Sequence, residues 1–107
     1  MIRYTANVPV TKARYELYKD EIGGTFEEFE GSEMEILVEI DGYNVLAFDR
    51  SNNYINLEIY HMREVLPNGG TVRLTSEIEK LIKKEIQEQI IEKERLWERL
   101  WERKYGA

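Results

Sequence analysis

Residues 76–105 read SEIEKLIKKEIQEQIIEKERLWERLWERKY, a stretch without glycine or proline. Its first part repeats apolar residues three and four positions apart, which is typical of an amphipathic helix covering a core. Ser76 and Glu79 have the spacing of a capping box, and Gly106 is a natural stop. We therefore expect one continuous helix over residues 76–105. Its core-facing positions are Ile78, Leu81, Ile82, Ile86 and Ile90.

The second part of this helix has a different pattern. Residues 92–95 are all charged, and after them the pair Leu-Trp occurs twice, four positions apart. At about 1.5 Å per residue the helix would be about 45 Å long, more than the diameter of a compact domain of this length. We therefore expect its distal part to project and to form a contact surface, most simply in a homodimer. The alternative is that both tryptophans complete the protomer's own core. This aromatic helix end comprises Leu96, Trp97, Leu100, Trp101 and Tyr105.

The N-terminal part predicts a strand and then a short helix. Apolar and polar residues alternate over residues 2–10, which is the pattern of a half-buried strand. Over residues 11–22 the apolar positions lie near helical spacing, and Gly23-Gly24 ends the segment, so we expect a short helix, with a β-hairpin as the alternative. Residues 25–30 fit either one helical turn or an irregular loop.

The middle of the chain predicts a β-hairpin over residues 33–48. Apolar residues alternate with others on both sides of Asp41-Gly42, which is a strong signal for a two-residue hairpin turn. Such a turn would pair Ile40 with Tyr43. Residues 55–59 continue the alternation as a third strand of a meander.

Two shorter features follow. The alternation slips around His61 and Met62, which indicates a β-bulge, and a last strand contains Val72 and Leu74. The predicted fold is α+β: a mostly antiparallel, four- to five-stranded meander with a short helix near the N-terminus and the long C-terminal helix packed on one face. We expect a single domain over residues 1–107, with the sheet body and short helix in 1–75 and the long helix in 76–105.

The amino-acid composition excludes several kinds of functional site. The 107 residues include no cysteine and one histidine, which excludes disulfides, thiol nucleophiles and most zinc sites. No apolar run approaches the roughly twenty residues that cross a bilayer. The first residues show neither the basic flank nor the apolar run of a secretory signal. We therefore expect a cytoplasmic protein that does not bind membranes.

We also expect no enzymatic activity, cofactor or metal site. His61 has no nucleophile at a recognisable spacing, so a structural role is favoured for it. Asp49, Ser51 and Asn53 resemble part of a calcium loop, but the required glycine and bidentate glutamate are missing, which favours an ordinary turn.

The net charge of −6 has a local origin. Residues 20–41 contain nine carboxylates and no lysine or arginine. An acidic surface disfavours direct binding to nucleic acid, whose affinity for proteins comes largely from lysine and arginine. It suits a protein partner with a basic surface, although a solvated face that keeps the protein soluble is the alternative. The predicted partner-binding residues are Glu27, Glu28, Glu30, Glu33, Glu35, Glu39 and Asp41.

These patterns favour a non-enzymatic, acidic inhibitor or regulator that engages the basic, nucleic-acid-binding surface of a target enzyme. In size, acidity and lack of cysteine the chain is similar to small phage inhibitors of host defence enzymes, anti-CRISPR proteins among them. That likeness involves composition and no shared motif. The alternative function is a structural module that oligomerises through the aromatic helix end.

Overall fold

The strands form two antiparallel sheets. The computed structural model describes residues 2–106, apart from the side chain of Tyr105. The larger sheet has the order β1-β2-β5-β6, and the smaller one pairs β3 with β4. This confirms the predicted α+β class and its antiparallel pairing. The strands are β1 (Ile2–Pro9), β2 (Glu33–Ile40), β3 (Gly42–Asp49), β4 (Tyr54–Tyr60), β5 (Arg63–Val65) and β6 (Thr71–Arg73).

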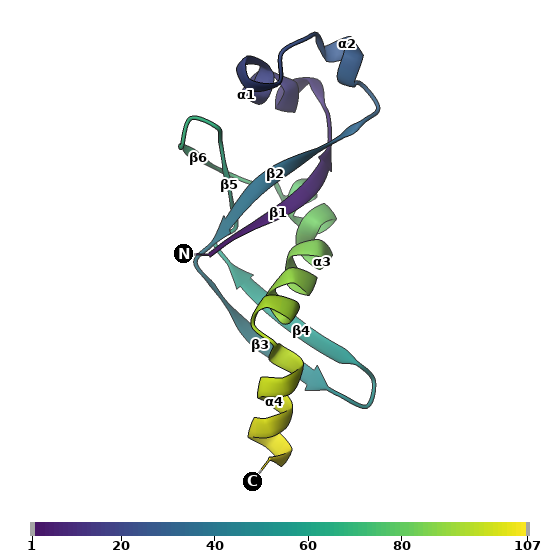
Figure 1. Ribbon diagram of the computed structural model, residues 1–107, viewed down its shortest axis with the longest axis vertical. Helices are drawn as coiled ribbons and strands as arrows, with labels where there is room; N and C mark the ends of the chain where they lie inside the picture. Colours follow the sequence, from purple (N-terminus) through teal and green to yellow (C-terminus); the bar gives the residue numbers. More distant parts are fainter. Residues whose placement is uncertain (1, 107) are drawn as a thin grey trace.

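Four helices complete the molecule, which is elongated, with extents of 58 × 25 × 20 Å. Figure 1 shows α1 and α2 at one end, α4 and the C-terminus at the other, and the sheets and α3 between them. The short helix expected over residues 11–22 and the helical turn within 25–30 are both present. The helices are α1 (Lys12–Ile22), α2 (Phe26–Phe29), α3 (Ser76–Lys93) and α4 (Leu96–Tyr105).

The prediction of one continuous C-terminal helix is wrong. The helix stops after Lys93 and restarts at Leu96, and Arg95 between them is left-handed with φ 52°. A non-glycine residue in this conformation costs about 1–2 kcal/mol. Burying the side chain of Leu96, which is 3% exposed, contributes about 1.5–3 kcal/mol and offsets that cost. After the break, α4 continues toward the C-terminal end of the molecule, with Leu96 packed in the core (Figure 1).

The start of α3 also differs from the prediction by one residue. Thr75, rather than Ser76, is the N-cap, and its hydroxyl accepts a hydrogen bond from the backbone N–H of Ile78 at 3.3 Å. The predicted capping box of Ser76 and Glu79 is therefore wrong, because Thr75 already occupies the capping position.

The predicted hairpin between residues 33–40 and 43–48 is also wrong. β2 pairs along its whole length with β1, so that Ile40 lies opposite Ile2, and its other edge pairs with β5. Both edges of β2 are therefore occupied, and no edge remains for β3. Asp41-Gly42 is instead the place where the chain leaves one sheet for the other, and β3 pairs with β4.

A second crossing lies at His61, where a β-bulge was expected. His61 is left-handed with φ 54°, and it returns the chain from β4 to β5 of the larger sheet. The register shift that the structure does contain lies in β3, between Val45 and Ala47. The slip in the alternation thus reflects a change of sheet rather than an extra residue within one.

Helix α3 covers the core and also closes two strand edges. Gln89 accepts from the backbone N–H of Thr5 at 3.4 Å and donates to its carbonyl oxygen at 2.6 Å. Gln87 donates to the carbonyl oxygen of Ile55 in β4 at 2.7 Å. The buried core joins all these layers and includes Tyr4, Ala6, Val8, Ile36, Val38, Ile40, Ile55, Leu57, Ile82, Ile86, Ile90 and Leu96.

Candidate protein-binding surface

Three aromatic rings form the centre of the end that carries α1 and α2. The ring of Tyr15 lies 6.1 Å from that of Phe26 and 6.3 Å from that of Phe29, measured between centroids. All three residues are half-buried, while Leu17 and Ile22 of α1 are 46% and 37% exposed. Apolar side chains are therefore partly open to solvent at this projecting end, as they are at the centres of protein interfaces.

Carboxylates surround this aromatic cluster. Glu27, Glu28 and Glu30 are exposed on and beside α2, and Glu33 and Glu35 are exposed at the start of β2. Residues 11–35 contain eight acidic and three basic residues, which gives a net charge of 3 − 8 = −5 out of the −6 of the chain. We call residues 11–35 the acidic end.

The acidic end is attached to the body by a buried ion pair. Arg14 of α1 donates from Nη1 to both carboxylate oxygens of Glu64 in β5, at 2.6 and 2.7 Å. Tyr18, one helical turn later, donates its hydroxyl to the same carboxylate. Burial and this hydrogen bond raise the pKa of Tyr18. Because Glu64 is 0% and Arg14 8% exposed, the pair fixes where α1 lies.

Arg14 therefore adds little to the surface charge of this end. Its guanidinium is buried against Glu64, and Lys19 forms an exposed ion pair with Glu16 at 3.0 Å. The remaining carboxylates on α1, α2 and β2 are presented to solvent without equal numbers of cations, so the surface potential of this end is negative.

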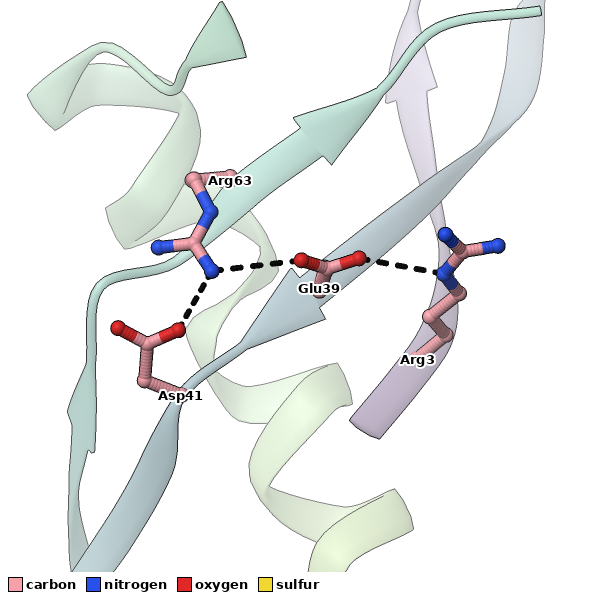
Figure 2. A network of polar contacts seen from close by, with 4 residues as sticks. All are labelled: Arg3, Glu39, Asp41 and Arg63. Carbon is pink, nitrogen blue, oxygen red and sulfur yellow. Dashed lines mark hydrogen bonds and ion pairs between the residues drawn. The ribbon is translucent and has the colours of Figure 1, made fainter. Parts of the chain in front are cut away.

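Two of the predicted acidic residues belong instead to a network within the larger sheet. Glu39 is 5% exposed and lies between Arg3, at 3.2 Å, and Arg63, at 3.3 Å (Figure 2). Arg63 also donates to Asp41 at 2.5 Å, and this hydrogen bond lowers the pKa of Asp41. Arg3, Glu39 and Arg63 belong to β1, β2 and β5, so the network joins three neighbouring strands. Because Asp41 follows β2 directly, the network lies at the crossing between the sheets. Glu39 is thus turned toward arginines of its own chain.

The aromatic helix end packs against the smaller sheet. Leu96 is buried in the core, and Trp97 is half-buried with its ring 5.6 Å from that of Phe48. Leu100 is half-buried, and Trp101 is 39% exposed with its ring 4.5 Å from the guanidinium of Arg50. Of this predicted surface, only Trp101 is exposed, while the side chain of Tyr105 lies outside what the structure describes.

In residues 2–106, no group of three or more His, Cys, Asp and Glu side chains is arranged to hold a metal ion. His61 is exposed at the crossing between the sheets. Asp49 accepts hydrogen bonds from the backbone of Ser51 and Asn52, so it forms the predicted turn. Among the described helices, none is long and apolar enough to cross a membrane.

Sequence reasoning missed the attachment of the acidic end. Arg14 and Tyr18 are four residues apart and share one face of α1, and Glu64 lies on the core face of β5 opposite Val38. The sequence does show a charged residue on the core-facing side of each element, Arg14 in α1 and Glu64 in β5. It does not show that these two side chains meet.

Comparisons with protein-family models, with curated proteins and with solved structures found no match to this chain.

Proposed function

We propose that this protein is a binding module whose acidic end engages a basic surface on a target protein. The observation that carries this proposal is the aromatic cluster of Tyr15, Phe26 and Phe29, which projects from the body and has exposed carboxylates around it. An apolar centre supplies affinity when it is desolvated, and the surrounding charges speed association and select the partner.

The favoured target is an enzyme that binds nucleic acid. Its basic groove is built to attract phosphates, so exposed carboxylates compete for the same lysines and arginines. Glu27, Glu28, Glu30, Glu33 and Glu35 come from two elements that meet at this end, and their arrangement is therefore broader than a single strand. Binding of the acidic end to the target's basic groove would keep nucleic acid out of it, so the target would be inhibited without any chemical reaction.

The test uses charge reversal. The purified protein captures its target from a host lysate, and the association rate of the purified pair is then measured at about 0.05 M and about 0.5 M salt, where screening differs strongly. Replacing Glu27, Glu28 and Glu30 by Lys should slow association at least about tenfold at low salt, because steering by opposite charges is lost. Displacement of nucleic acid from the target is the second readout.

The matched control reverses the same number of exposed carboxylates elsewhere, at Glu58, Glu77 and Glu102. This variant has the same net charge as the test variant, and at low salt it should associate with the target almost as fast as the wild type does. Association that depends equally on both sets, or on neither, would refute an interface at the acidic end.

A second candidate function is oligomerisation through the aromatic helix end. The specific observation in its favour is Trp101, which is a large apolar side chain that is 39% exposed beside the half-buried Leu100. Tryptophan is enriched in interfaces because it brings a large apolar area.

A further inference from the structure

A groove of about 810 Å³ lies between α3 and the start of β4. Its apolar lining includes Ile55, Ile91 and Trp97, and Tyr54 at its rim is 49% exposed. The groove therefore combines an apolar floor with an accessible ring, which is the arrangement that receives an amphipathic segment.

One part of this groove is basic. Lys80, Lys83 and Lys84 line it, all three are exposed, and no ion pair is formed by any of them within the described chain. Lys80 and Lys84 are one helical turn apart, and like charges at this spacing disfavour a helix. On the same helix Glu79 lies four residues before Lys83, and Glu88 lies four residues after Lys84, a spacing that favours a helix. None of these carboxylates forms an ion pair with a lysine in the described chain, so the three ammonium groups face solvent.

The opposite charges in the groove are either paired or lie farther along it. Arg95 and Glu98 form an ion pair with each other at 2.6 Å within the C-terminal helix region. Glu88 and Glu92 line the part that follows the lysines by one to three helical turns. A ligand that suits the lysine part must be acidic and must carry apolar side chains for Tyr54.

The chain itself contains such a segment. Helix α2 carries Phe26 and Phe29 with Glu27 and Glu28 between them, and Glu30 follows; all three glutamates are exposed. Figure 1 shows α2 at the opposite end of the molecule from the β3–β4 turn that borders the groove. The segment and the groove therefore suit each other but do not meet within one copy.

We infer that α2 of one copy docks in the lysine part of the groove of a second copy. Glu27, Glu28 and Glu30 lie opposite the lysines, and the aromatic cluster lies against Tyr54. Each copy offers one acidic end and one groove, so the contact is heterologous and head-to-tail, and it extends into longer assemblies. A basic partner that occupies the acidic end competes with this contact and shortens the assemblies.

The experiment is sedimentation velocity of the full chain from about 10 to about 500 µM, at about 0.05 M and about 0.5 M salt. The wild type should associate at low salt and dissociate at high salt. The variant K80E/K83E/K84E and the variant E27K/E28K/E30K should each associate at least tenfold more weakly. An equimolar mixture of the two should associate again, because the acidic end of the first fits the basic groove of the second, and the reversed pair is formed as well.

The matched control is R73E/R99E/R103E, which changes the net charge as much as K80E/K83E/K84E does but lies outside the groove lining. It should associate as the wild type does. A wild type that stays monomeric at the highest concentration in low salt would overturn the inference, as would failure of the mixture to associate. Target binding is read separately, since K80E/K83E/K84E leaves the acidic end unchanged, so this inference and the proposed function can fail independently.

Discussion

The two ends of the molecule are attached to the body in different ways. The acidic end is held by Arg14, Tyr18 and Glu64, which are polar groups buried together. Helix α4 is held by Leu96 in the core and by Trp97 against Phe48. The first attachment is directional and charged, and the second is apolar and depends mainly on area.

A buried ion pair and an apolar contact respond differently to the substitution of one residue. A buried ion pair becomes strongly unfavourable when one partner is lost, because the other charge then stays buried alone. An apolar contact weakens in proportion to the atoms removed and to the cavity that they leave. The acidic end should therefore be the more sensitive of the two to a single substitution.

The largest expected effect follows from removing Glu64. Glu64→Leu should lower the free energy of unfolding by about 3–5 kcal/mol, because Arg14 remains buried without its carboxylate. Urea denaturation followed by circular dichroism measures this. The double variant Arg14→Met with Glu64→Leu should recover most of the loss, since both charges are then gone. A double variant as unstable as the single one would show that packing, rather than charge, holds this end.

A smaller effect is expected at the other end. Leu96→Ala should cost about 2–4 kcal/mol, because a buried side chain is truncated and leaves a cavity. Trp101→Ala should cost about 1 kcal/mol or less, since the ring is 39% exposed and its contact with Arg50 is at the surface. Thermal melts of both variants give the comparison. Equal losses would mean that the aromatic helix end is one structural unit.

The titration of Tyr18 gives the smallest expected effect, and this effect is confined to alkaline pH. Burial raises the pKa of Tyr18 above its ordinary value of 10.0, so the folded state holds this proton more tightly than the unfolded state does. Stability from this source is complete below pH 10 and is lost as pH rises above it. Tyr18→Phe should make the loss of stability between pH 10 and 11 less steep. Unchanged steepness, measured by urea denaturation at each pH, would assign the alkaline loss to other groups.

The elements themselves could be predicted from periodicity, whereas strand partners could not. Alternation located the strands at residues 2–9, 33–40 and 54–60 closely, because each has one face against the core. Asp41-Gly42 leads to a hairpin only if the preceding strand has an unpaired edge that the following strand can join. β1 and β5 already occupy both edges of β2, and this is a tertiary fact that no local pattern contains.

The candidate site was predictable in part. Glu27, Glu28 and Glu30 are exposed as a charged helical turn would be, but Glu39 is buried because Arg3 and Arg63 lie beside it. The charged run before Leu96 marked a change in the helix, yet helix propensity alone favoured continuation through it. The burial of Leu96 in the core offsets the cost of the left-handed residue at 95, and the sequence alone does not show this contact.

The side chain of Gln89 has a consequence for how this protein avoids aggregation. Its primary amide contacts the N–H and the C=O of Thr5 as a neighbouring strand would, and Gln87 does the same for one carbonyl of β4. Exposed strand edges are templates on which other chains add. If α3 detaches while the strands persist, edges in both sheets are uncovered at the same time. Such a partly unfolded species would offer two free strand edges to other chains, so docking of α3 protects against aggregation as well as against unfolding.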